Sequence, residues 1–273
     1  MAQSWLGELV VGAKQIVPGL VPDLYDVSAL DGQGYQINNW KSMAAMGAPA
    51  SPSDYYRMNL LDRLGDSVRN ERLAVLASAY PRAHLRPTIS PGATPGVDGL
   101  PLYLGSPDVT PYLVLKNQLF QLYAAGATGF ALYTQSGMYD MGMWLAMRDV
   151  FEVISAPNIE SIILDGAPVA DGTVCNCNDH AVVNAMMGRD GTDQMLIASS
   201  SMPPGTAINA CVRSTVSVDW KLCDLTTNGT VPTTIAVNGS SRTATVCWSS
   251  EAELGRLLLL TRHSCNVMVG HTA

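Results

Sequence analysis

Several aspartates stand at or just after the ends of strands that the sequence predicts in its first half. They are Asp23, Asp26, Asp31, Asp98, Asp108 and Asp140. Two carboxyl groups that face each other across a glycosidic bond can hydrolyse it, with one of them acting as an acid. Asp31 precedes a glycine and is typical of a turn. Asp26 is the main candidate among them for direct chemistry.

Aromatic and hydrogen-bonding side chains follow the same predicted strand ends. Aromatic rings stack on the apolar faces of sugars, and polar side chains bind the hydroxyl groups. The pattern predicts a carbohydrate-binding surface of Tyr25, Arg86, Tyr133, Gln135, Tyr139, Asp140 and Trp144. Four of these residues also have a structural alternative. Tyr25 and Tyr133 would be core tyrosines, Asp140 would cap a helix, and Trp144 would pack that helix against a sheet.

Other kinds of site find little support in the sequence. There is no Gly-x-Ser-x-Gly elbow for a serine nucleophile. Gly32-x-Gly34 lacks the third glycine and the helix of a dinucleotide site. No Cys-x-x-Cys pair has the spacing of a zinc site, so neither a metal nor a cofactor is expected. The net charge of −7 and the absence of basic runs argue against nucleic acid, and no apolar stretch is long enough to cross a membrane.

The cysteines indicate the compartment. All six lie in the second half, at Cys175, Cys177, Cys211, Cys223, Cys247 and Cys265. Two glycosylation sequons begin at Asn228 and Asn238 in the same region. Together they favour an extracellular or secretory location and at least two disulfides within this half, against the alternative of six buried thiols. Six cysteines allow 15 connectivities, so the pairing stays open. The first residues do not resemble a signal peptide, which suggests a fragment, a trimmed chain or a misassigned start.

The composition changes near Asp165. All ten tyrosines lie between Tyr25 and Tyr139, and all cysteines lie after position 174. We therefore expect two domains, 1–164 and 165–273. The first shows strand, loop and helix three times, which predicts a parallel sheet. Helices are predicted over 3–17, from Ser51 to about Ala79 with a break near Gly65, over 111–125 and over 140–154, and strands over 21–29, 84–90 and 128–134.

The second domain reads as short strands separated by turn clusters. The strands are expected at 181–187, 194–199, 207–214, 218–225, 233–237, 243–248 and 256–261. About seven such strands are typical of an antiparallel β-sandwich. Its only aromatic residues, Trp220 and Trp248, are expected in the core. We interpret this domain as a packing module.

Three segments carry a resemblance to a known class of enzymes. Leu85–Gly92, Gly126–Tyr133 and Asp140–Trp144 look like the last two strands and the start of the final helix of a β/α barrel. With the sandwich that follows, the chain resembles the C-terminal part of TIM-barrel glycoside hydrolases. The fold class expected is thus α/β plus all-β, a partial (β/α) barrel followed by an antiparallel β-sandwich.

The resemblance implies a carbohydrate-active protein that carries part of a substrate cleft. The clan of glycoside hydrolases that uses a glutamate nucleophile is disfavoured, because no glutamate stands near Ile89 or Ser90. Asp26 or Asp23 would match an aspartate after the sixth strand. Three strands are visible where a barrel has eight, so a missing N-terminal segment or a partner chain would complete it. The alternative is a non-catalytic extracellular structural or adhesion protein with a degenerate barrel.

Overall fold

The computed structural model describes fifteen segments of the chain. These are residues 2–18, 24–27, 50–53, 61–77, 84–89, 111–132, 141–169, 174–176, 181–188, 194–201, 205–214, 220–227, 229–238, 243–250 and 255–265. Structural statements below refer to them.

A four-stranded parallel sheet lies in the first half. Its strands are β1 (Leu24–Val27), β2 (Ala50–Ser53), β3 (Thr88–Ile89) and β4 (Ala131–Leu132), and they are arranged in the order β1-β2-β3-β4. The expected parallel sheet is confirmed, and β2 adds a strand to the three that the sequence indicated. Neighbours in the chain are therefore neighbours in the sheet throughout.

The expected helix start at Ser51 is wrong. Ser51 and Pro52 belong to β2, which pairs with β1 through Tyr25↔Ser51 and Asp26↔Pro52. A residue that precedes proline favours extended backbone, and here pairing with β1 holds it there. The helix α3 (Leu61–Leu76) begins later and continues through Gly65 without a break. Gly65 fits because it lies against the side chain of Asn184, where a Cβ atom would clash.

Three more helices follow in this half. The helix α5 (Pro111–Ala125) has the predicted bounds, with proline at its first position and Gly126 just after its end at a φ of 118°. The helix α6 (Met141–Ile154) is also confirmed. The sequence analysis missed α7 (Pro157–Asp165), which begins at a proline and carries Glu160 in its first turn.

The second half contains two antiparallel sheets, as expected. The six-stranded sheet has the order β11-β10-β14-β8-β7-β5, and the four-stranded sheet has the order β12-β13-β9-β6. The seven predicted strands correspond to β7 (Ala181–Met187), β8 (Gln194–Ser201), β9 (Ile208–Ser214), β10 (Lys221–Asp224), β12 (Thr234–Asn238), β13 (Thr243–Ser250) and β14 (Arg256–Thr261). Three short strands were missed, namely β5 (Ala167–Pro168), β6 (Val174–Asn176) and β11 (Gly229–Val231).

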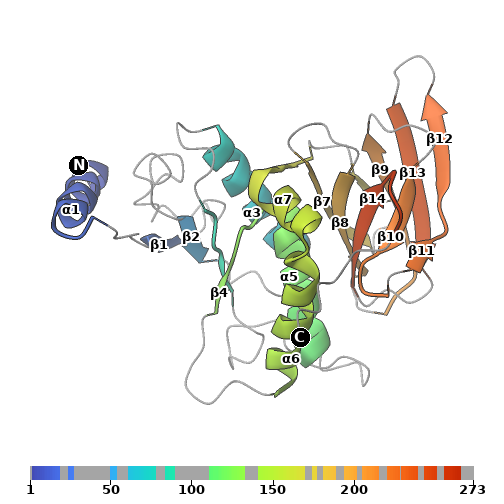
Figure 1. Cartoon of the computed structure of the whole chain (residues 1–273), viewed down its shortest axis with the longest axis horizontal. Coiled ribbons are helices and arrows are strands. Elements are labelled where there is room, and N and C mark those ends of the chain that lie inside the picture. The colour runs from blue at the N-terminus through green and yellow to red at the C-terminus, as the bar shows by residue number, and fades with distance from the viewer. Residues whose placement is uncertain are drawn as a thin grey trace.

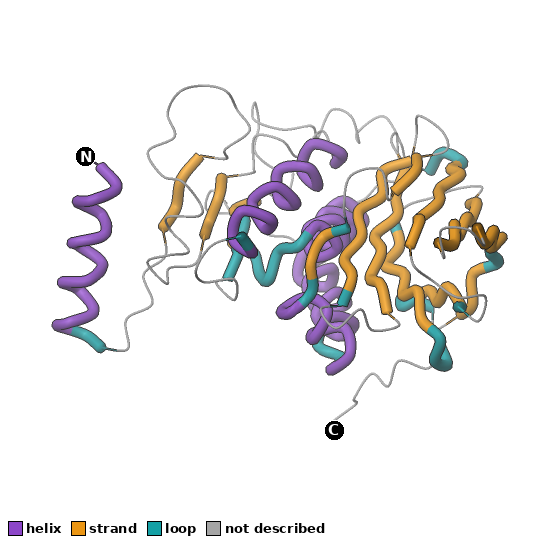
Figure 2. The backbone as a smooth tube through the Cα atoms, turned by 90° about the horizontal axis from the view of Figure 1, so that it is seen from above, coloured by secondary structure: helices purple, strands orange, loops and turns teal. Residues whose placement is uncertain are grey.

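The elements form successive layers (Figures 1 and 2). The helices α3, α5 and α6 lie between the parallel sheet and the six-stranded sheet. The four-stranded sheet covers the face of the six-stranded sheet that is turned away from these helices. One core cluster joins the helices to one face of the six-stranded sheet, with Phe120, Leu196 and Leu257 among its members. A second fills the sandwich and contains Trp220 and Trp248, as expected. Because α5 is covered on opposite sides, it is buried nearly all round, including its polar residues Asn117, Gln118 and Gln121.

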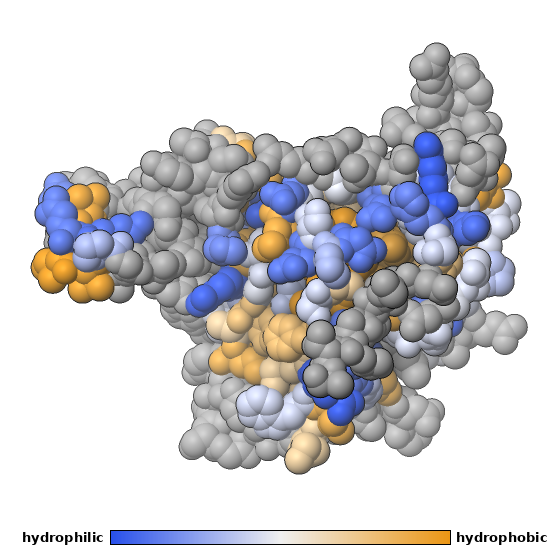
Figure 3. All heavy atoms as spheres, in the orientation of Figure 1, coloured by the Kyte–Doolittle hydropathy of each residue, from blue (hydrophilic) through white to orange (hydrophobic). Residues whose placement is uncertain are grey.

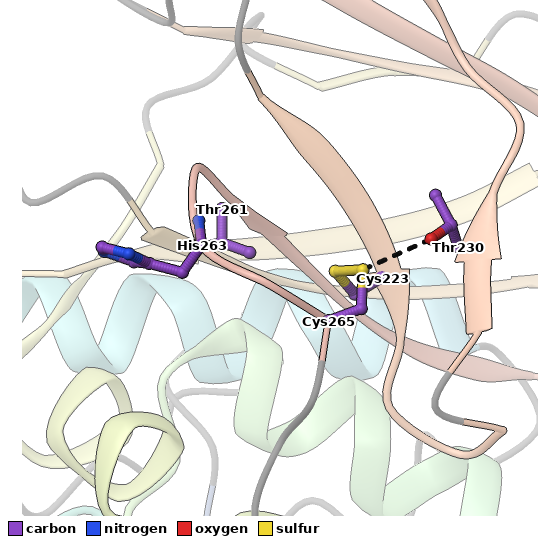
Figure 4. Close-up of a disulfide and its surroundings, with 5 residues drawn as sticks. All are labelled: Cys223, Thr230, Thr261, His263 and Cys265. Carbon is purple, nitrogen blue, oxygen red and sulfur yellow. Dashed lines mark hydrogen bonds between the residues drawn. A yellow bond between two sulfur atoms is a disulfide. The ribbon is translucent and has the colours of Figure 1, made fainter.

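Two disulfides connect strands of the sandwich. Cys211 of β9 is bonded to Cys247 of β13, and Cys223 of β10 is bonded to Cys265 just after β14. In Figure 4, Cys265 approaches Thr230 of β11, whose hydroxyl lies 3.6 Å from the Cys265 sulfur. The expectation of at least two disulfides within the second half is confirmed.

The first helix, α1 (Ala2–Ile16), stands away from these layers in both views of the backbone. Its exposed apolar residues Leu9, Val11 and Ile16 are consistent with the hydrophobic surface visible there in Figure 3. No helix among the described residues is both long and apolar enough to cross a membrane.

Candidate functional site at the carboxyl edge of the parallel sheet

The register of the parallel strands defines one common edge. Val27 pairs with Ser53, Ser53 with Thr88, and Thr88 with Ala131. These four residues form a row across the sheet, and the strands end at this row or one residue beyond it. Loops that leave the strands therefore start side by side, which is how parallel sheets assemble sites from distant segments.

Asp26 lies one residue before this row, on β1. Its backbone pairs with Pro52, and Tyr25 before it pairs with Ser51. Asp23 directly precedes the strand and lies outside the described residues. The structure thus places Asp26 next to the carboxyl edge, and its catalytic role stays a prediction.

Arg86 stands just before β3. It precedes Thr88 of β3 by two residues and is half-buried. Its side-chain Cγ lies beside Gly129, which itself precedes β4. Arg86 therefore precedes the row by two residues, as Tyr25 does on β1. Thr88 of β3 is buried at 6% exposure.

Tyr133 follows β4 directly, and Gln135, Tyr139 and Asp140 lie in the segment between β4 and α6. All four lie outside the described residues. Trp144 is described, in the first turn of α6, and 57% of it is exposed. The alternative in which Trp144 packs α6 against the sheet does not match this exposure, because Met143 beside it takes the buried position. An exposed tryptophan is thus available on the helix that follows β4.

A polar cluster that the sequence analysis did not find joins α5 to α6. The Tyr112 hydroxyl donates a hydrogen bond to Asp149 Oδ2 at 2.6 Å, and Lys116 Nζ donates to the Tyr112 oxygen at 3.1 Å. Arg148 donates to Asp149 Oδ1 from NH2, also at 2.6 Å. The pairs Tyr112–Lys116 and Arg148–Glu152 are spaced by four residues, which is the one signal that sequence could offer.

The ionisation states of the residues in this cluster indicate a structural role. Burial, helped by the hydrogen bond to Asp149, raises the pKa of Tyr112 to about 12. Partial burial disfavours the Asp149 carboxylate, but hydrogen bonds from Tyr112 and Arg148 outweigh it, and the pKa of Asp149 is lowered. At neutral pH the phenol stays protonated and the carboxylate stays ionised. The cluster therefore positions α5 against α6 and does not exchange protons.

The opposite edge of the sheet has a structural role. Thr128 donates from its hydroxyl to the Leu85 carbonyl at 3.1 Å and accepts from the Leu85 amide at 2.9 Å. His84 Nδ1 lies 3.3 Å from the same hydroxyl. These contacts give His84 a structural role beside Thr128. Among the described residues, no group of three or more His, Cys, Asp or Glu side chains could hold a metal ion.

The sequons lie at turns of the sandwich. Asn238 is the last residue of β12 and pairs with Thr243 of β13. Asn228 stands between β10 and β11 and lies outside the described residues.

Known proteins resemble this chain only in structure. No protein-family profile matches it, and no curated protein matches it. A family 44 endoglucanase from Clostridium acetobutylicum is similar with a TM-score of 0.43 and 10% identity, over 96% of this chain and 61% of that one. A family 5 glycoside hydrolase from Bacteroides vulgatus is similar with a TM-score of 0.44 and 11% identity, over 93% of this chain and 58% of that one.

A family 44 xyloglucanase from Paenibacillus polymyxa gives a TM-score of 0.37 and 12% identity, over 95% of this chain and 50% of that one. The chain thus spans between 50% and 61% of the length of these three structures. The likeness to glycoside hydrolases concerns overall structure at low identity. The assignment of α/β plus antiparallel β architecture rests on the strand pairings described above.

Proposed function

We propose that this chain is a carbohydrate-active protein of the glycoside-hydrolase type, with its sugar-binding surface at the carboxyl edge of the parallel sheet. The observation that carries the proposal is the strand order β1-β2-β3-β4. In a doubly wound nucleotide-binding sheet the order reverses at a switch point, whereas in a β/α barrel it always advances. Sequential order therefore favours a barrel-type site, in which every loop after a strand contributes to one surface.

Asp26 is the catalytic candidate of this surface. It is the carboxylate in the described parallel strands, and it stands next to the row at which they end. Tyr133 begins the loop after β4, on the opposite side of the sheet from β1. Trp144 supplies an exposed aromatic ring on α6. Sugar binding and glycosidic hydrolysis require an acid together with aromatic side chains.

The second candidate function is sugar binding without catalysis, in an extracellular structural or adhesion protein. The composition of β3 and β4 favours it, because Thr-Ile and Ala-Leu place no carboxylate at the ends of these strands. A hydrolase needs two carboxyl groups about 5–10 Å apart, so a partner for Asp26 would have to come from a loop.

The location we propose is extracellular or secretory. Two disulfides support it, since such bonds persist in oxidising compartments. Asn228 and Asn238 would then be glycosylated. We also propose that the outer strands β1 and β4 pair with further strands, from another segment or a partner chain, because exposed parallel edges invite pairing.

The test uses the full chain and a panel of soluble polysaccharides, namely xyloglucan, carboxymethylcellulose and starch. Binding is measured by affinity electrophoresis and hydrolysis by the release of reducing ends. For an enzyme, Asp26→Asn abolishes release while binding and thermal unfolding persist. For a binding protein, no release occurs, and Tyr133→Ala weakens affinity about tenfold, which corresponds to about 1.4 kcal/mol.

The matched control is His84→Ala, on the amino-terminal side of the sheet. It should leave both binding and release unchanged. The proposal fails if no polysaccharide binds, or if His84→Ala reduces binding as much as Tyr133→Ala does.

A further inference from the structure

The helix α6 carries two exposed aromatic rings on one face. Trp144 is 57% exposed and Phe151 is 45% exposed. Residues seven positions apart in an α-helix lie nearly above each other, because seven residues complete almost two turns. At a rise of about 1.5 Å per residue, the two positions are about 10.5 Å apart along the helix axis. The helix thus presents two rings in line on a straight support.

The Phe151 ring is fixed by a second aromatic ring. It stacks on Phe130, with 5.8 Å between the ring centroids and 15° between the ring planes. Phe130 packs against the core that joins the helices to the six-stranded sheet. A stack of this kind covers one face of the Phe151 ring, and the exposure of the residue leaves the other face open to a ligand. A ring that is already held in place loses little conformational entropy on binding.

Charged groups stand between the two rings. Arg148 follows Trp144 by four positions and precedes Phe151 by three, so it belongs to the same helix face. Its Nε atom lies 3.8 Å from Glu152 Oε1, and both side chains are more than half exposed. A guanidinium donates hydrogen bonds and a carboxylate accepts them. The face therefore combines two ring surfaces with a donor and an acceptor that a ligand can reach.

This combination suits a sugar better than a second protein. The buried centre of a protein interface is depleted in charged residues, and covering the Arg148–Glu152 pair with a protein would remove its hydration. Sugar hydroxyls can accept from the guanidinium and donate to the carboxylate, so they replace that hydration. The apolar faces of sugar rings can stack on Trp144 and Phe151 at the same time.

The position of α6 connects this face to the carboxyl edge of the parallel sheet. Phe130 stands directly before β4, and it stacks on Phe151, which lies late in α6. The helix therefore runs back along β4, as in a β/α unit. Trp144, in the first turn, lies at the end of α6 that is nearer to the carboxyl edge. The two rings thus lead away from that edge along the helix.

We propose that Trp144, Phe151 and the Arg148–Glu152 pair form a second binding site, outside the cleft, for an extended polysaccharide chain. The inference rests on the proposed function and adds a polymeric ligand to it. A separation of about 10.5 Å between the rings corresponds to about two sugar units of an extended chain. A chain that coils, as starch does, does not follow the straight line of the helix. Binding at this site and at the carboxyl edge would reinforce each other through one continuous chain.

The test measures binding of the full chain to hydroxyethylcellulose, an extended polysaccharide, by affinity electrophoresis, with soluble starch as the coiled comparison. Trp144→Ala and Phe151→Leu should each weaken binding to hydroxyethylcellulose about fivefold, and their affinity for starch should not change. Trp144→Phe keeps an aromatic ring and should retain affinity within about twofold. Phe151→Leu keeps an apolar side chain against Phe130, and thermal unfolding of each variant verifies that it folds.

The matched control is Leu145→Ala. Leu145 is also an exposed apolar residue of α6, but it is turned about 100° around the helix from Trp144. Its removal should change affinity by less than about twofold. Direct contact has a separate readout, because hydroxyethylcellulose should shield the tryptophan fluorescence of the parent from acrylamide. Part of this shielding should disappear in Trp144→Phe, although that variant still binds.

The outcomes separate this site from the cleft. If hydroxyethylcellulose binds and Tyr133→Ala weakens it, but the Trp144 and Phe151 variants bind as the parent does, the inference is overturned and the proposed function stands. If only the α6 variants lose affinity, the site on α6 is supported and the cleft is contradicted. Equal losses on hydroxyethylcellulose and starch would overturn the assignment of an extended chain, and no binding to either would overturn both proposals.

A second copy of the chain is the other occupant that the experiment detects. Sedimentation velocity should give the same sedimentation coefficient for the parent and for Trp144→Ala. If the parent sediments as a dimer and Trp144→Ala as a monomer, a second copy covers this face of α6, and the inference is overturned.

Discussion

Asn184 of β7 donates a hydrogen bond from Nδ2 to Gln121 Oε1 of α5 at 2.7 Å. Gln121 in turn donates from Nε2 to the Ser200 hydroxyl at 2.8 Å. All three residues are buried, and they join the helical layer to the six-stranded sheet. The two halves of the chain, which differ so clearly in composition, are therefore held together by a polar network inside a shared apolar core.

Removal of Gln121 should weaken the whole molecule. Gln121→Leu leaves the Asn184 amide buried without this partner, which costs about 1–3 kcal/mol in the free energy of unfolding. Urea denaturation followed by circular dichroism measures the change. Gln15→Leu on the exposed surface of α1 is the control and should change stability by less than about 0.5 kcal/mol. Equal effects of the two variants would contradict a structural role for the network.

Two glycines in helices should respond in opposite ways to alanine. Gly65 of α3 lies against the Asn184 side chain, so Gly65→Ala forces that side chain to move and should destabilise by about 1–3 kcal/mol. Gly12 of α1 has nothing within 4 Å of the added methyl group, and Gly12→Ala should increase helix propensity. Thermal unfolding compares them. A Gly65→Ala protein as stable as the parent would show that the contact with Asn184 is loose.

The Cys223–Cys265 disulfide should contribute strongly to stability. It joins residues separated by 42 positions, and the chain-entropy relation for a loop of this length gives about 4 kcal/mol. The double variant Cys223→Ala/Cys265→Ala should therefore unfold at a clearly lower denaturant concentration. In this variant dithiothreitol should still lower the transition further, because the Cys211 disulfide remains. No difference between oxidised variant and parent would refute this.

The link between Tyr112 and Asp149 predicts a stability that depends on pH. The folded state lowers the pKa of Asp149 below its ordinary 3.8, so the folded state favours the carboxylate. This contribution is present above pH 3.8 and is lost as the pH falls through the lowered value. Tyr112→Phe removes one donor and should destabilise at pH 7. The difference between parent and variant should shrink towards pH 2, as measured by urea denaturation at each pH.

A pH-independent effect of Tyr112→Phe would mean that lost packing, and not the hydrogen bond to Asp149, dominates. Arg69→Gln provides a comparison, because Arg69 pairs with Asp66 within α3 and takes no part in the cluster of Tyr112 and Asp149. An exposed pair of this kind is worth at most about 1 kcal/mol.

The sequence alone determined the elements whose signals are local. Pro111 and Gly126 mark the ends of α5, and alternation between turn clusters marks seven strands of the sandwich. The restriction of cysteine to one half was sufficient to predict disulfides there. These features depend on backbone preferences and side-chain patterns within a few residues, so they can be recognised before any tertiary contact is known.

The tertiary structure decided what depends on distant partners. Ser51 and Pro52 carry the signal of a helix start, yet pairing with β1 makes them a strand. Arg86 stands before a short strand, and only the register places it level with Tyr25, two residues before the common row. The position of Cys211 between Cys175 and Cys247 exists only because β9 lies between β6 and β13. Strand order and register come from contacts between residues far apart in the chain, and no local preference encodes them.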